Sequence, residues 1–213
     1  LGPSDIRKVQ ELMLPRDDPD YDNNLALFQY RFPLDSSREE VLEQLQSFAG
    51  GDSIELVGIN LINTRVREKL KSFLGEFLAG LNAIEKVSGK QFDFSDCSIM
   101  NCLYAGAFLA SNRNIEQATV SIDRIFQLCG TVLPTSIEDK KLVAQRENGE
   151  ILYTEADIVE LRSNVRINRI YLLDKSLDKS NFEILDNNEQ RSYLERHHCY
   201  VGVSSGVRLA LQQ

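Results

Sequence analysis

The sequence predicts a mixed α/β protein, and three observations carry this prediction. Apolar residues recur at steps of three and four from Thr64 to Lys86, the period of a helix packed against a core. The dipeptide Asn148-Gly149 lies between two alternating segments, which is a strong hairpin signal. The segment "RINRIYLLD" at 166–174 then predicts a buried strand. Helical patterns therefore precede strands, which indicates a mixed class.

Two helices are predicted before this long one. A short amphipathic helix near the amino terminus begins at Ser4 or Asp5, which are favoured capping residues. The next helix begins with a capping box formed by Ser36 and Glu39. It is expected to end at the glycine pair 50–51, because glycine accepts the left-handed conformation that closes a helix.

Further elements are predicted on the carboxyl-terminal side of the long helix. One helix runs from Ser98 to about Ala110, and another runs from Asn114 to a stop at Gly130. The chain ends in a strand-like "CYVGV" and a helical "VSSGVRLALQQ". In an α/β chain, a further strand would be expected to follow that helix.

Length and composition indicate one globular unit. The chain has 213 residues, 42% of them hydrophobic, which is enough to bury one sizeable core. We expect a single domain over residues 1–213, with a helical part at about 64–129 and a hairpin-and-strand part at about 131–174. No internal repeat and no low-complexity tract divides the sequence.

Charge and cysteine content limit the class of partner and the compartment. The net charge of -8 argues against electrostatic binding of nucleic acid or of an anionic membrane. No apolar run approaches the roughly 20 residues that a membrane-spanning helix requires. The cysteines form no CxxC pair and are too sparse for a disulfide scaffold, so we expect reduced thiols in the cytoplasm. They are Cys97, Cys102, Cys129 and Cys199.

The amino-terminal "LGPSDIRK" is a candidate phosphate site. A turn containing Gly2 leads into a helix start, where unpaired N–H groups and a positive dipole end favour an anion. Arg7 and Lys8 add cationic side chains in the first turn. Asp5 is a candidate ligand for a Mg²⁺ ion that bridges to the phosphate. The alternative is that Ser4 and Asp5 merely cap the helix.

A second candidate is the helix start that follows "SDCSIMN". Asn101 lies in the first turn, where its amide can both donate and accept hydrogen bonds and so orient a ligand or a neighbouring loop. The alternative is a solvated or locally bonded asparagine. Ser98 is expected to be a cap and not a nucleophile, because neither histidine of the chain has a recognisable acidic partner pattern.

Several stretches, in this order, resemble the 2-phospho-L-lactate transferase (CofD-like) family, which includes the gluconeogenesis factor (YvcK-like) branch. "GPSDIRK" at 2–8 is similar to the family's P-P-G-D-I-R-N segment. "DFSDCSIMNCLYAG" at 93–106 resembles D-F-R-x-x-S-I-G-N-L-x-L-A-G, and "GTVLPTS" at 130–136 resembles V-L-P-V-T. "LVAQRENGEILYTEADI" followed by "INRIYLLD" resembles the family's hairpin and succeeding strand.

The resemblance implies a fold and a site. It implies a Rossmann-like three-layer fold with a mostly parallel sheet, a β-hairpin excursion, and a ligand at the carboxyl ends of the strands. It also implies that Asp5 serves in catalysis and binds Mg²⁺. The residues that it places at a ligand with phosphates are Gly2, Ser4, Arg7, Lys8, Ser98, Asn101, Pro134 and Thr135.

The two branches of the family imply different functions. In the transferase branch, a phospholactyl or phosphoenolpyruvyl group on a nucleoside diphosphate passes to a deazaflavin alcohol, with Mg²⁺ as cofactor. In the regulator branch, a UDP-sugar is bound and no catalysis is established. An interaction module that has lost its ligand is a third reading. A nucleotide-type small molecule is thus the expected partner, with no nucleic acid and no membrane, and a homodimer is a further expectation.

The sequence also departs from the family pattern. Met100 stands where the family has a glycine, and a bulky side chain there opposes close approach of a ligand to the backbone. Ser4 replaces a glycine and Lys8 an asparagine. The family's G-G-G-T-G and G-P-G-S turns have no counterpart in these 213 residues. We therefore expect this chain to be a segment of a longer protein.

Overall fold

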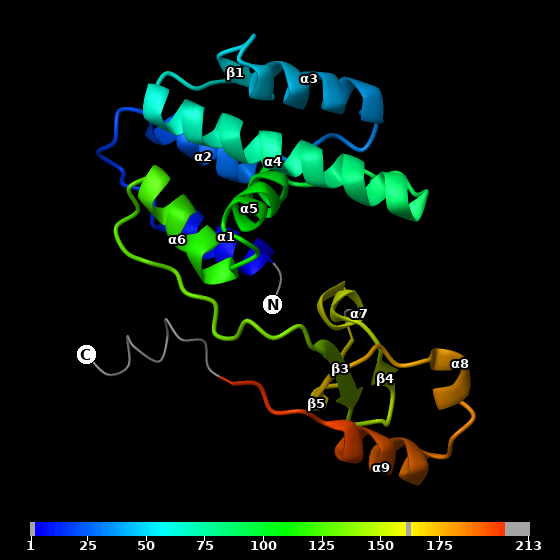
Figure 1. Ribbon diagram of the computed structural model, residues 1–213. Coiled ribbons are helices and arrows are strands. Elements are labelled where there is room, and N and C mark those ends of the chain that lie inside the picture. Colours follow the sequence, from blue (N-terminus) through cyan, green and yellow to red (C-terminus); the bar gives the residue numbers. More distant parts are fainter. Residues whose placement is uncertain (1–2, 161–162, 203–213) are drawn as a thin grey trace. The chain divides into compact units, whose positions relative to one another are not determined.

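The described residues form two compact units. The computed structural model describes residues 3–160 and 163–202, with side chains from residue 6 to 159 and from 163 to 202. The units meet in the sequence between Thr135 and Ser136, and each is described by itself (Figure 1). The single domain expected over residues 1–213 stays a prediction.

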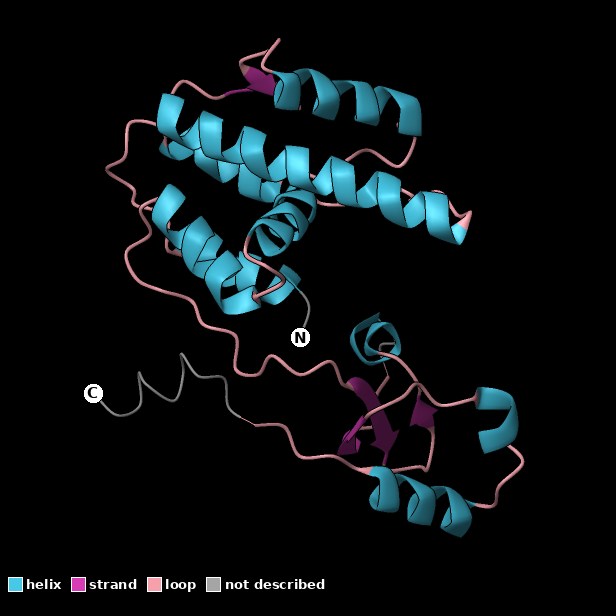
Figure 2. Ribbon diagram, viewed as in Figure 1, coloured by secondary structure: helices cyan, strands magenta, loops and turns pink. Residues whose placement is uncertain are grey.

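The first unit consists of helices with one short pair of strands (Figure 2). The strands β1 (Glu55–Leu56) and β2 (Ile59–Asn60) pair in antiparallel fashion. Most of the apolar core of the chain lies in this unit. Its helices are α1 (Pro3–Leu12), α2 (Tyr21–Gln29), α3 (Arg38–Gly50), α4 (Thr64–Ser88), α5 (Ile99–Ala110) and α6 (Ile115–Ile125).

The long helix α4 confirms the clearest prediction from periodicity. It begins at Asn63, whose side chain accepts hydrogen bonds from the N–H groups of Arg65 and Val66, and it ends at Gly89 with a φ of 67°. Helix α4 lies between α3 and α5 (Figure 1). The buried stripe along α4 comprises Val66, Leu70, Phe73, Leu74, Phe77 and Leu81.

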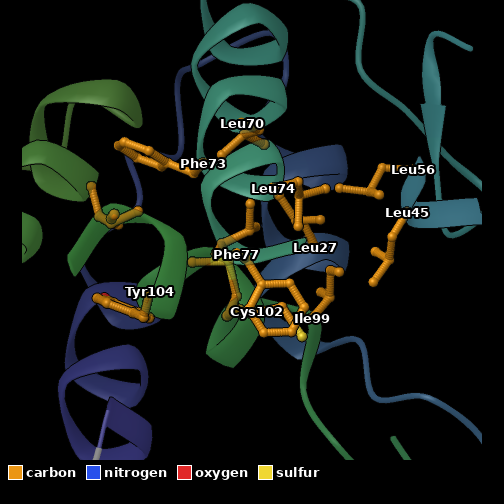
Figure 3. Packing of buried hydrophobic residues seen from close by; sticks show 14 of the residues in the cluster. Leu27, Leu45, Leu56, Leu70, Phe73, Leu74, Phe77, Ile99, Cys102 and Tyr104 are labelled. Carbon is orange, nitrogen blue, oxygen red and sulfur yellow. The ribbon is translucent and has the colours of Figure 1, made fainter. Parts of the chain in front are cut away.

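Helix α5 crosses α4 at close range, and a glycine permits the approach. A Cβ atom built on Gly106 would lie 1.8 Å from the carbonyl oxygen of Phe73, so no side chain fits between the two helices. Figure 3 shows the packing around this crossing, where Phe77 of α4 lies near Ile99 and Cys102 of α5. Most of α5 is buried, which places this helix at the centre of the unit.

The capping box of α3 forms one residue later than predicted. The N–H of Glu40 donates to the side chain of Ser37, and the Glu40 carboxylate accepts from the Ser37 N–H. The sequence "DSSREE" offers two serines followed three residues later by a glutamate, so spacing alone did not separate them. Gly51 closes the helix with a φ of 88°, as expected from the glycine pair.

This assignment gives a direct test. Ser37→Ala is expected to lower the free energy of unfolding by about 1 kcal/mol, because it removes the side-chain acceptor of the cap. Ser36→Ala, one position earlier, is expected to change it by less than about 0.5 kcal/mol. Urea unfolding followed by circular dichroism measures both values. A larger loss for Ser36→Ala than for Ser37→Ala would contradict the observed cap.

The second unit is a small sheet with short helices. Strands β3 (Lys141–Arg146) and β4 (Ile151–Leu152) form the predicted hairpin, in which Gly149 has a φ of 90°. Strand β5 (Ile167–Leu173) pairs with β3, so the order is β4-β3-β5 and both pairings are antiparallel. The helices are α7 (Glu155–Glu160), α8 (Lys179–Phe182) and α9 (Asn187–His197).

The predicted buried strand at 166–174 is buried on one part of its length only. Tyr171 and Leu173 are buried, whereas Ile170 is 56% exposed. Five buried side chains form the core of this unit, and they come from β3, β5, α8 and α9. They are Val143, Tyr171, Leu173, Phe182 and Leu194.

The predicted Rossmann-like three-layer fold is wrong for the described residues. Their sheets have two and three strands, and every pairing is antiparallel. A parallel sheet needs strands joined by crossover helices. Residues 64–125 instead supply three consecutive helices, which bury their apolar faces on one another and leave no place for such strands. The hairpin is therefore no excursion from a larger sheet, since its strand β3 is the centre of a small one.

The predicted final elements have a mixed outcome. Residues 199–202 contain no strand, although the N–H of Cys199 donates to the carbonyl oxygen of Leu172 at 2.8 Å. The helix expected in "VSSGVRLALQQ" lies outside the described residues.

Candidate functional site

The start of helix α5 is held by a distant segment of the chain. Ser98 occupies the N-cap position of α5, but its side chain makes no capping hydrogen bond. Ser98 is 1% exposed and donates its hydroxyl hydrogen to the carbonyl oxygen of Tyr30 at 3.2 Å. Arg31 and Ser98 form an isolated antiparallel bridge. The hydroxyl of Ser98 is therefore used inside the fold and does not face a solvent-filled cleft.

Some N–H groups in the first turn of α5 already donate to backbone carbonyl oxygens. The N–H of Ile99 donates to the Tyr30 carbonyl oxygen at 3.4 Å, and the N–H of Asn101 donates to the Ser98 carbonyl oxygen at 2.9 Å. Met100, which stands at the family's glycine position, is fully buried. Two of the N–H groups that could attract an anion thus already have acceptors.

Asn101 differs from its neighbours in one respect. Its Oδ1 atom is buried and has no hydrogen-bond partner within residues 3–160 and 163–202. A buried acceptor of this kind calls for a partner, such as an ordered water molecule or a ligand donor. Asn101 is therefore a predicted residue whose surroundings leave a polar contact to be made.

The two predicted cations of α1 have different surroundings. Arg7 is 3% exposed and donates from Nη1 to the carbonyl oxygen of Phe28 at 2.6 Å. Its Nε atom has no hydrogen-bond partner in the described part of the chain. Lys8 has a side chain that is 64% exposed and lies 3.4 Å from the carboxylate of Glu11. Lys8 is thus accessible to an anion, whereas Arg7 is enclosed by protein.

A buried polar group joins α1 to α6. Gln10 is fully buried and donates from Nε2 to Oδ1 of Asp123 at 2.5 Å. The second carboxylate oxygen of Asp123 accepts from the N–H of Val132 at 3.1 Å. Burial raises the pKa of Asp123, against the opposing effect of these two hydrogen bonds. The contact ties the segment after α6 to the helical core.

Tyr104 of α5 lies in the same buried region. Its hydroxyl group has no hydrogen-bond partner among the described residues. Burial raises the pKa of Tyr104, the charge of Asp123 raises it further, and the charge of Arg7 acts in the opposite direction. Side chains of α1, α5 and α6 therefore interact electrostatically around Tyr104.

The two predicted segments, at the starts of α1 and α5, belong to neighbouring helices. Helices α1 and α5 are in contact. Tyr104 follows Asn101 by three positions on α5, so the two side chains share one stripe of that helix. The charge of Arg7 acts on the pKa of Tyr104, which is consistent with the contact between the two helices. Two segments far apart in the sequence are thus neighbours in the first unit.

Two shallow grooves lie outside the predicted site. One, of about 440 Å³, lies where α4 and α5 meet and includes Gly80 and Arg113. The other, of about 470 Å³, includes Asp123 and the segment from Gln127 to Thr131. Neither Arg7 nor Asn101 lines either groove.

The remaining predicted site residues are Gly2, Ser4, Asp5, Pro134 and Thr135. Pro134 is buried and Thr135 is exposed, both outside regular elements. Gly2 lies outside the described residues, and the side chains of Ser4 and Asp5 do as well, although both belong to α1. Among the described residues, no group of three His, Cys, Asp or Glu side chains could hold a metal ion. Mg²⁺ at Asp5 therefore stays a prediction.

Sequence reasoning missed Gln10, Tyr104 and Asp123. A signal was present for Asp123, which lies beside Ile122 and four residues after Thr119 on the apolar side of an amphipathic helix. An acid at such a position is expected to have a buried partner. Its partner Gln10 is 113 positions away, so no local pattern could identify it.

No described helix combines the length and the apolar character that crossing a membrane requires. Comparison of the chain with protein-family models, with curated proteins and with solved structures gives no significant match. The resemblance to the CofD-like family therefore continues to rest on the quoted motifs.

Proposed function

We propose that this chain binds a phosphorylated, nucleotide-type small molecule and contributes to a CofD-like transfer reaction. In this reaction, a phospholactyl or phosphoenolpyruvyl group passes from a nucleoside diphosphate to a deazaflavin alcohol. The order and spacing of the motifs support the proposal. The carrying observation is the unpartnered Oδ1 of Asn101 on α5, a helix that contacts α1. The proposal does not depend on a parallel sheet.

The proposed roles follow from exposure and charge. Lys8, which is accessible, would attract the phosphate, and Asn101 would accept a hydrogen bond from the ligand. Arg7 would act by holding the backbone at Phe28 in place. These residues would bind and orient, which is the main contribution of protein to phosphoryl-type transfer. Mg²⁺, when bound, would neutralise phosphate charge, with Asp5 as its one candidate ligand.

Two alternatives remain as proposals. A UDP-sugar-binding regulator would use the same residues without an acceptor pocket. One specific observation favours an interaction module without a ligand. At the start of α5, the Tyr30 carbonyl oxygen already accepts hydrogen bonds from the Ser98 hydroxyl and the Ile99 N–H. In each case we propose a cytoplasmic location, consistent with sparse cysteines.

A thermal-shift screen separates the three functions. The protein is heated with GDP, GTP, UDP-sugars and a deazaflavin, each with and without Mg²⁺. A ligand at about a hundred times its dissociation constant adds roughly 2.7 kcal/mol of stability. A shift with guanosine nucleotide and Mg²⁺ would support the transferase, and a shift with UDP-sugar alone would support the regulator. No shift with any ligand would support the interaction module and contradict the proposal.

Asn101→Ala tests the proposed site. Its apo melting temperature is expected to stay near that of the unmodified chain, because Oδ1 has no hydrogen bond to lose within the described residues. The ligand-induced shift is expected to fall by about 1 kcal/mol, the usual net value of one hydrogen bond. Asn82→Ala, at an exposed position of α4, is the matched control and should keep the full shift. An unchanged shift in Asn101→Ala would remove Asn101 from the site.

A further inference from the structure

The residues that follow helix α9 pair with the outer strand of the small sheet. We call residues 198–202, which come directly after α9, the edge segment (Figure 1). The N–H of Leu172 in β5 donates to Nδ1 of His198 at 3.1 Å, and the Leu172 carbonyl oxygen accepts from the N–H of Cys199 at 2.8 Å. Because β5 is an edge strand in the order β4-β3-β5, these contacts cover backbone groups that face away from the sheet.

Two carboxylates hold the far end of the edge segment. The N–H of Gly202 donates to Oε1 of Glu138 at 2.7 Å, and the thiol of Cys199 donates to Oδ2 of Asp174 at 3.2 Å. Lys140 contacts both acids, at 3.3 Å from Glu138 and 2.6 Å from Asp174. The Gly202 N–H and then Lys140 lower the pKa of Glu138, and Lys140 and then Cys199 lower the pKa of Asp174. Both carboxylates therefore keep their charge where histidine gains its proton.

The contact of His198 requires one protonation state of its ring. A backbone N–H can only donate, so Nδ1 of His198 must carry no hydrogen in order to accept from Leu172. The single ring hydrogen of the neutral form is then on Nε2. In the protonated ring both nitrogens carry hydrogen, so Nδ1–H would face the N–H of Leu172. Protonation therefore removes this hydrogen bond and sets two donors against each other.

The neighbouring His197 has the opposite requirement. Its Nδ1 lies 2.8 Å from the carbonyl oxygen of Tyr193, and its ring stacks on the Tyr193 ring with 4.1 Å between the centroids. A carbonyl oxygen can only accept, so Nδ1 of His197 must donate. Protonation of the other ring nitrogen leaves this hydrogen bond intact. Of the two adjacent histidines, only His198 thus loses its contact in acid.

The surroundings of His198 contain paired charges. Its ring meets the ring of Tyr171 edge-on at 6.0 Å and that of Tyr200 at 5.1 Å. Among the described residues, both acids on the neighbouring elements are in ion pairs, so no unpaired carboxylate holds a proton on the ring. The charged groups of these elements are Arg169 of β5, Arg191, Glu195 and Arg196 of α9, and Lys140 and Asp174 at the end of the sheet.

We propose that the edge segment is an acid-sensitive switch, in which His198 and Cys199 pair with Leu172 at neutral pH and leave it when His198 is protonated. Histidine is the side chain that ordinarily changes charge between about pH 5 and 8. The pairing is complete while the ring is neutral and is lost as the pH falls through this range. Gly202 stays bound to Glu138, so the opening is local. It uncovers the N–H and carbonyl groups of Leu172 on an edge strand, where a strand of another chain can pair.

Amide hydrogen exchange of the full chain, followed by NMR, tests the switch. Protection of the Leu172 amide, corrected for the intrinsic exchange rate at each pH, is expected to fall about tenfold from pH 7 to pH 5, because one hydrogen bond is lost. Nitrogen chemical shifts of the His198 ring report its protonation, and the fall should follow them. The amide of Tyr171, which pairs with Val143 inside the sheet, should keep its protection.

Two variants separate the histidines. His198→Asn places an acceptor oxygen near the position of Nδ1 that no proton can block, so protection of Leu172 is expected to be the same at pH 7 and pH 5. His197→Asn is the matched control at the adjacent position and should show the full tenfold fall. If His198→Asn does not form the hydrogen bond, the unmodified chain and its ring shifts decide the question.

Three results would overturn the proposal. The first is unchanged protection of Leu172 in the unmodified chain between pH 7 and pH 5. The second is a fall that does not follow protonation of the His198 ring, or that is equally large in a His198→Asn variant that forms the hydrogen bond. The third is a parallel loss at Tyr171, which would show that the whole sheet opens.

Discussion

Gly106→Ala is expected to lower the free energy of unfolding by about 3 kcal/mol or more. The added Cβ would lie 1.8 Å from the carbonyl oxygen of Phe73 and 2.6 Å from its carbonyl carbon. Both atoms belong to the backbone of α4, so no side-chain rotation relieves the clash. The two central helices must separate, and the packing on both sides of their crossing is lost. Urea unfolding followed by helical circular dichroism measures the change.

Gly75→Ala is the matched control, on the exposed side of α4. A Cβ there meets nothing within 4 Å. Alanine is favoured over glycine inside a helix by about 0.5–1 kcal/mol, so this variant is expected to be more stable than the unmodified chain. If Gly106→Ala unfolded at the same urea concentration as Gly75→Ala, the close crossing of α4 and α5 would be refuted.

Asp123→Ala is expected to lower the free energy of unfolding by about 2 kcal/mol, because it removes an acceptor that two donors share. These donors are Nε2 of Gln10 and the N–H of Val132. Asp123→Asn keeps one acceptor oxygen and nearly the same shape, so its loss should be smaller. Equal stability of the alanine variant and the unmodified chain would show that the contact between α1 and α6 is not formed.

The same residue predicts a pH effect of definite sign. Burial raises the pKa of Asp123 above the ordinary aspartate value of 3.8, so the folded state favours the protonated form. The stabilisation that this provides is complete below the unfolded pKa and is lost as the pH rises through the folded pKa. From about pH 4 to about pH 7, the unmodified chain should therefore lose stability relative to Asp123→Asn. A constant difference between the two proteins over this range would contradict the prediction.

Several local features were predictable because they depend on neighbours in the chain. The period of apolar residues from Thr64 to Lys86 predicted α4, and Asn148-Gly149 predicted the hairpin. Where two local solutions had similar merit, as with Ser36 and Ser37, the prediction missed by one position. Such patterns identify elements, their ends and a hairpin between neighbouring strands, but they contain no information on which distant elements pair.

The candidate site was predictable to a smaller extent. The position of Asn101 in the first turn of a helix followed from the sequence. The carbonyl oxygen of Tyr30 that fills part of that turn comes from 68 positions earlier than Ser98. Whether an N–H group of this turn is free for a ligand therefore depended on the contact with Tyr30, which no local sequence pattern predicts.

The amino-acid sequence by itself determined where helices and the hairpin form, since hydrogen bonds and apolar periodicity within a few residues decide those features. Only the tertiary structure decided that β5 pairs with β3 in antiparallel fashion, that Gly106 lies against Phe73, and that Gln10 meets Asp123. The physical reason is that each of these contacts joins residues distant in the chain. Their energies depend on burial and close packing of the whole unit.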